Sequence, residues 1–124
     1  MSIDLSALNY LAILIGGILY MIYGAIYYSL LVGKENQSKG ALKYVISVIV
    51  AFISSIFIAI LVQATSSNSL LEGAAVGGII GILISIVYLK NSLFGLVNKR
   101  NFLIAIGDHF IIFTLLGALH GLFV

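Results

Sequence analysis

The sequence contains no cysteine, no proline and no tryptophan, and only six basic and four acidic side chains occur among its 124 residues. Without cysteine, the chain can form neither disulfides nor thiolate metal sites. Without proline, none of its helices has a kink fixed by that residue. Charged residues make up 8% of the chain, whereas a soluble domain carries about a quarter. So few charges exclude a soluble monomer, and the high hydrophobicity excludes a disordered chain.

Hydrophobic residues, in contrast, make up 62% of the chain, and the mean hydropathy is +1.24. A membrane-spanning helix needs about 20 apolar residues, because each residue advances about 1.5 Å through a core about 30 Å thick. Long apolar runs without the alternating polarity of membrane strands predict helices. We therefore predict an all-α integral membrane protein, with one transmembrane domain over residues 1–124 that is an antiparallel up-down four-helix bundle. Its predicted spans are residues 10–32, 44–63, 73–89 and 102–124.

The basic residues are confined to two of the connectors between these spans, at 33–43 and 90–101: Lys34, Lys39, Lys43, Lys90, Lys99 and Arg100. Positive charge close to span ends marks cytoplasmic loops. The distribution therefore predicts that both connectors are cytoplasmic and that both termini lie outside. The pI of about 9.0 arises from very few charges, so we expect the lipid bilayer, and no nucleic acid, as a partner.

Glycines recur at every fourth position on one face of the third span and again in the fourth. This spacing lets two helix backbones approach closely, which drives helix association in membranes. The face can pack within one bundle or between the protomers of a homo-oligomer, and the pattern leaves both open. Four short helices enclose little volume, so a transport path would require two or more protomers. The predicted helix-packing residues are Gly73, Gly77, Gly81, Gly117 and Gly121.

Asp108 is the most informative residue, because a carboxylate inside the hydrocarbon costs at least about 2.5–3.5 kcal/mol. We predict an ion or proton site with Asp108 as the carrier and the neighbouring His109 as its relay. Alternatively, Asp108 makes a buried hydrogen bond that only fixes the order of the helices. Helix lengths place four further side chains at its depth, the tyrosines as the lining of the site: Tyr23, Tyr27, Ser54 and Ser85.

Glu72 and His120 should lie at similar depth near the outer surface, where the third span begins and the fourth ends. We predict that they form an outer-surface pair, or that Glu72 instead caps its own helix. The two histidines are about 16 Å apart along the helix, too far to share a metal ion. No catalytic motif is present either. We expect no metal, no cofactor, no catalytic residues and no enzymatic activity.

Three stretches resemble the family catalogued as domain of unknown function 1761. The first span opens with Asn9-Tyr10-Leu11-Ala12 and closes with Gly24-Ala25-Ile26-Tyr27-Tyr28, followed by Gly33-Lys34. The last span carries Gly107-Asp108-His109. This chain has Tyr27 where the family pattern has tryptophan, and it lacks the proline before Gly33-Lys34. The resemblance implies a four-span bacterial or archaeal membrane protein without an assigned activity.

Together these features predict a multi-pass protein of a prokaryotic cytoplasmic membrane. We expect a homo-oligomeric transporter or channel for a small ion, linked to protons through Asp108. The alternative is a non-transporting accessory or structural protein whose glycine faces bind a larger membrane partner.

The orientation can be tested by replacing either Ser38 or Asn68 with cysteine. Because the sequence contains no cysteine, the introduced residue is then the only thiol in the chain. On intact cells, a membrane-impermeant thiol reagent should label position 68 and leave position 38 unlabelled, because the basic connectors face the cytoplasm. The opposite pattern of labelling would show that the topology is inverted.

Overall fold

The computed structural model describes residues 3–124, and this part of the chain is helical and contains no strand. Each of the four long helices is long and apolar enough to cross a membrane. The predicted class of an all-helical four-span membrane protein is therefore confirmed, while its orientation stays a prediction. The long helices are α1 (Tyr10–Leu31), α2 (Leu42–Ala64), α3 (Leu70–Leu93) and α4 (Lys99–Leu122), and short 3-10 helices lie at Leu5–Ala7 and Lys34–Asn36.

Helices α3 and α4 both begin before their predicted spans, because polar residues cap their first turns. The Ser69 hydroxyl accepts a hydrogen bond from the Glu72 amide, and the Asn98 side chain accepts one from Asn101. Gly95, with φ of +81°, allows the chain to turn after α3. Lys90 and Lys99 therefore belong to helix ends, where long side chains can reach water.

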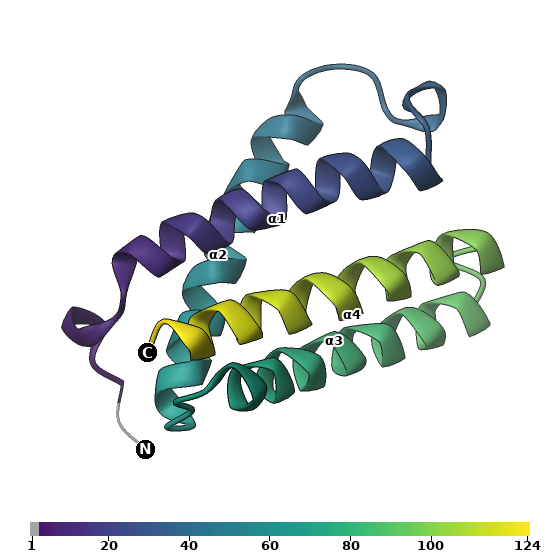
Figure 1. Ribbon diagram of the computed structural model, residues 1–124. Helices are drawn as coiled ribbons and strands as arrows, with labels where there is room; N and C mark the ends of the chain where they lie inside the picture. The colour runs from purple at the N-terminus through teal and green to yellow at the C-terminus, as the bar shows by residue number, and fades with distance from the viewer. Residues whose placement is uncertain (1–2) are drawn as a thin grey trace.

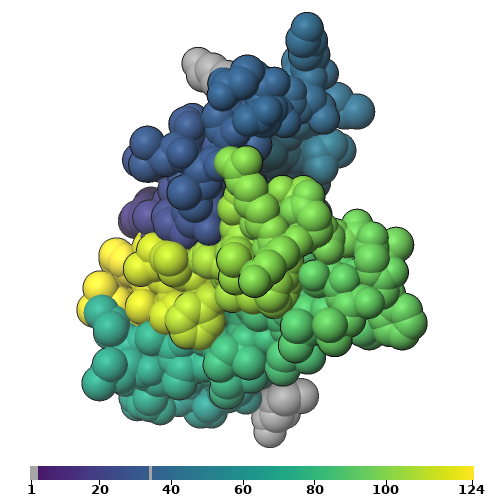
Figure 2. Space-filling model, turned by 90° about the vertical axis from the view of Figure 1, so that its right-hand side faces the viewer, coloured from purple at the N-terminus to yellow at the C-terminus, as the bar shows by residue number. Residues whose placement is uncertain are grey.

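Figure 1 shows α3 and α4 side by side and antiparallel, with α1 along the opposite side of α4 and α2 crossing steeply behind. Both chain ends lie at the same end of the molecule as the α2–α3 connector. The α1–α2 and α3–α4 connectors lie at the other end, which faces the viewer in Figure 2. All the lysines lie in or next to these two connectors, so we call this end the lysine end. There the Arg100 guanidinium donates a hydrogen bond of 3.1 Å to the Leu31 carbonyl, tying the start of α4 to the end of α1.

The tightest packing in the molecule is a glycine seam, which we define as Gly73, Gly77 and Gly81 of α3 against Gly117 and Gly121 of α4. A methyl group on Gly77 would overlap the Phe113 carbonyl oxygen, and one on Gly81 would lie 2.8 Å from Phe110 Cα. Backbone therefore meets backbone along several turns. The structure places the predicted glycine face inside one chain, between consecutive helices.

Helix α2 has two unlike halves. Its second half contributes buried residues, among them Ile58 and Val62, which pack with Ile112, Phe113 and Leu116 of α4 to form the core. Its first half, residues 42–50, has no buried residue although nearly all of it is apolar. The core therefore lies toward the end of the molecule that carries the termini, and α2 separates from the bundle toward the lysine end.

The seam predicts opposite effects for two adjacent glycines. Gly77→Ala should lower the free energy of unfolding by about 1–3 kcal/mol, because the new methyl group overlaps backbone. Gly78→Ala should be neutral or stabilising by up to about 1 kcal/mol, since its nearest neighbour, Thr114 Oγ1, is 3.6 Å away and alanine favours helix. Thermal unfolding in detergent measures both. Equal midpoints would show that the seam does not form.

Candidate functional site

A cleft of about 800 Å³ lies between α1, α2 and α4 at the lysine end, where the first half of α2 departs from the bundle. Tyr20 and Tyr28 of α1 and Ser47 of α2 line it, and Lys43 lies at the start of α2, next to the connector. From α4, the cleft is lined by Asp108 and His109. A carboxylate deep in a membrane protein therefore borders a space that opens beside the loops.

The Asp108 side chain is 5% exposed, and its Oδ2 accepts a hydrogen bond from the Tyr28 hydroxyl. Tyr28 thus takes the place predicted for Tyr23 and Tyr27, because it lies on the side of α1 that lines the cleft together with Asp108. In the part of the chain that the structure describes, no lysine, arginine or histidine lies within ion-pair distance of this carboxylate. The site is a carboxyl–phenol pair without a counter-ion.

Tyr23 and Tyr27 do not line the cleft, which corrects the predicted lining of the site. Their rings stack on each other with centroids 5.5 Å apart. The Tyr27 hydroxyl donates a 2.7 Å hydrogen bond to the Ile104 carbonyl, and Gly107 leaves the room for it. The Tyr23 hydroxyl is buried without a partner. These two tyrosines therefore pack α1 against α4.

His109 does not bond to Asp108, so the predicted relay contact is absent. Its Nδ1 lies 2.7 Å from the Ala105 carbonyl oxygen, which can only accept, so Nδ1 carries the proton. The ring stacks on Tyr88 of α3, with centroids 5.3 Å apart.

The two predicted serines do not bond to Asp108 either. Ser85 donates to the Gly81 carbonyl of its own helix at 2.8 Å, because a serine hydroxyl readily reaches the preceding turn. Ser54 is half-buried on α2 and is not among the residues that line the cleft.

A second polar site joins three helices on the far side of the core. The Ser55 hydroxyl donates to the Ile13 carbonyl at 2.8 Å, and His120 Nε2 lies 3.0 Å from the same oxygen. Because the single hydroxyl proton goes to Ile13, Ser55 must accept from Nε2–H, which leaves Nδ1 of a neutral ring as an acceptor. Gly16 makes room, since a methyl group there would overlap Ser55 Oγ. The sequence does not predict that Ser55 is the partner of His120, because a sequence gives no crossing angle between helices.

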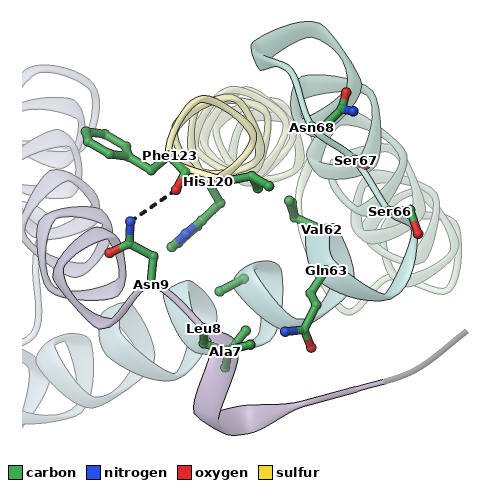
Figure 3. Close-up of a pocket in the computed structure, with 12 residues that line it drawn as sticks. Ala7, Leu8, Asn9, Val62, Gln63, Ser66, Ser67, Asn68, His120 and Phe123 are labelled. Carbon is green, nitrogen blue, oxygen red and sulfur yellow. Dashed lines mark hydrogen bonds between the residues drawn. The ribbon is translucent and has the colours of Figure 1, made fainter.

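Figure 3 shows His120 pointing from α4 into a pocket of about 250 Å³ between Asn9 and Gln63. Asn9 donates to the Phe123 carbonyl at 3.0 Å. The Gln63 amide makes two hydrogen bonds, of 2.8 and 2.9 Å, to the backbone of Asp4. Outside the spans, the Ser6 hydroxyl bonded to the Asp4 carboxylate holds the pKa of that group below its ordinary value. The termini are thus tied to this end of the bundle.

Glu72 does not pair with His120, which corrects the predicted outer-surface pair. Glu72 lies in the first turn of α3, where its carboxylate is 3.4 Å from the Ser69 hydroxyl. His120 is 4% exposed and turned toward Ser55, on the side of α4 that faces α1 and α2. The other predicted arrangement, in which Glu72 caps its own helix, agrees with these contacts.

A family model described as "Protein of unknown function (DUF1761)" matches residues 11–121. The chain belongs to this family. No curated protein and no solved structure matches the chain. In residues 3–124 of this DUF1761 protein, no three histidine or acidic side chains lie close enough to hold a metal ion. Any function must therefore be argued from the cleft and the pocket themselves.

The three-helix junction at Ser55 gives a stability prediction for this DUF1761 protein. Ser55→Ala should cost about 1–3 kcal/mol of unfolding free energy, because the buried Nε2–H of His120 loses its acceptor. Ser85→Ala is the matched control and should be nearly neutral, since its hydroxyl bonds only within its own helix. Thermal unfolding in detergent compares them, and equal losses would contradict the assigned proton on Nε2.

Proposed function

We propose that this protein is a homo-oligomeric, proton-linked transporter of a small cation, with Asp108 as the group that carries the cation or the proton. The observation that supports this most is a buried carboxyl group, bonded to a phenol and without a counter-ion, that borders a cleft of about 800 Å³. Ionisable groups inside a membrane are functional candidates because their burial is costly.

The chemistry of the cleft suits the exchange of a proton for a cation. A protonated Asp108 is neutral and tolerates the apolar surroundings, whereas an ionised one needs a positive partner that the described chain does not supply. A small cation entering the cleft would supply that charge. Tyr20 and Tyr28 line the same space, and aromatic faces attract cations.

Two observations agree with the passage of an ion through the protein from one side of the membrane to the other. The cleft at the lysine end and the His120 pocket at the opposite end are separated by the layer that contains Ser55 and Gly16. Asp108 and His120 lie about 18 Å apart along α4. One chain therefore has two openings and a closed centre, so transport requires a movement of α1 and α2 or a second copy that completes the path.

A second candidate, a non-enzymatic accessory protein that binds a larger membrane partner, is favoured by one feature. Residues 42–50 of α2 are apolar except for Lys43 and Ser47, and none of them is buried within the chain. Such a face could pack on a helix of another protein. This candidate requires no role for Asp108.

The proposal predicts that Asp108→Asn folds normally and abolishes proton-linked transport. Purified protein in liposomes containing a pH-sensitive dye would receive gradients of Na⁺, K⁺ and tetramethylammonium in turn. At least one gradient should drive proton movement in the wild type, and Asp108→Asn should reduce it to the level of empty liposomes. Asn cannot exchange a proton, but it keeps the size of the side chain and can still bond to Tyr28.

Asp4→Asn provides the matched control, because Asp4 is an exposed carboxylate outside the spans. It should transport as the wild type does. Wild-type protein without flux for any of the three cations, or undiminished flux in Asp108→Asn, would contradict the proposal and favour the accessory role.

A further inference from the structure

Gly24, in the second half of α1, has no described atom of a neighbouring element within 4 Å of the position that a methyl group would take. Among the glycines of α1, α3 and α4, every other one has an atom within 4 Å of the position that a methyl group would take. Those glycines make room for a neighbouring helix or side chain. At Gly24 the same position is open space, and the residue lines the cleft. Position 24 therefore has no side chain, and no described residue occupies the space beside it in the cleft.

The cleft has apolar walls and a basic side chain at its mouth. Its walls include Met21 and Ala25 from α1 and Ile46 and Val50 from α2. Its mouth, beside the connector, carries Lys43, whose ammonium lies 5.0 Å from the centre of the Tyr44 ring. An occupant that matches both regions has an anionic head at the mouth and an apolar tail between the walls.

The location of the cleft favours the same occupant. The mouth lies at the end of the molecule that carries all six lysine and arginine residues, a distribution that attracts anionic lipid headgroups. The wall made by residues 42–50 of α2 is exposed, so the cleft borders the lipid directly. The acidic side chain in the cleft, Asp108, lies at a depth that a headgroup at the mouth does not reach.

We propose that the cleft binds one anionic phospholipid from the leaflet at the lysine end, with its headgroup at Lys43 and an acyl chain along Gly24. The charge complementarity at the mouth and the unfilled space at Gly24 carry this assignment. The lipid separates Asp108 from the bulk bilayer on the open side of the cleft. This site does not depend on transport through Asp108.

Native mass spectrometry of the full chain in a neutral detergent can test the proposal. Phosphatidylglycerol and phosphatidylcholine with identical acyl chains would be titrated separately. One phosphatidylglycerol should bind per chain, more tightly than phosphatidylcholine. Lys43→Gln should weaken phosphatidylglycerol binding about fivefold, the effect of one basic residue near an anionic headgroup, and leave phosphatidylcholine unchanged. Lys90→Gln, at the same end but on α3 and outside the cleft, should change neither.

Gly24→Leu tests the tail of the lipid, because a Cβ at this position has no described atom of a neighbouring element within 4 Å and the residue lines the cleft, so the new side chain occupies space that the lipid would use. It should abolish the binding of both lipids and leave the thermal midpoint at or above that of the wild type, since leucine favours helix. Asp108→Asn should bind phosphatidylglycerol like the wild type, which separates this proposal from the proposed transport.

Four outcomes would overturn the proposal. Equal effects of Lys43→Gln and Lys90→Gln would show a diffuse attraction to the basic end. Undiminished lipid binding in Gly24→Leu would place the lipid elsewhere. Inorganic phosphate that competes as well as phosphatidylglycerol, or a change of oligomeric mass in Gly24→Leu without a change in bound lipid, would assign the cleft to a free anion or to a second copy.

Discussion

The close contact of two backbones along the glycine seam is the constraint on which the rest of the structure depends. Hydrophobic burial does not drive helix association within lipid, so α3 and α4 gain their affinity from van der Waals contact over a long, smooth face. That contact leaves α4 in the centre, with α3 on one side and α1 and α2 on the other. Because α1 and α2 meet α4 through side chains, their packing is more open, and the cleft forms there.

The two ends of the bundle are tied together to different degrees. At the end with the termini, Ser55 links α1, α2 and α4, and Gln63 binds the segment before α1. At the lysine end, the hydrogen bonds between helices join α1 to α4, through Tyr27, Tyr28 and Arg100. Within the described residues, no side-chain hydrogen bond joins the first half of α2 to another long helix. Movement of α2 at this end, about the Ser55 junction, would change the width of the cleft at small cost.

The features that the sequence predicts well depend on periodicity and composition alone. Four apolar runs predict the four helices, and the four-residue spacing from Gly73 to Gly81 identifies the face that meets another helix. Side-chain contacts between helices are harder to predict, because they depend on the crossing angles of the helices and on their offsets along the axes. A shift of one residue separates Tyr28, which binds Asp108, from the predicted Tyr27. Ser54, predicted at the depth of Asp108, does not bond to it, whereas the adjacent Ser55 bonds to His120. A helical wheel gives the face of a residue but not the neighbour that the face meets.

Asp108 borders a cleft that opens at the lysine end and passes Gly24, so it should be reached from that side. The most direct measurement uses the chain's lack of cysteine: Asp108→Cys would be reacted with a charged methanethiosulfonate reagent in oriented phosphatidylcholine vesicles, which lack the anionic lipid proposed to occupy the cleft. We predict rapid modification from the side of the lysine connectors and protection when Gly24→Leu is added. Ile112→Cys, in the fully buried core, should not react. Absence of reaction at position 108, or equally rapid reaction from the side of the termini, would contradict the account.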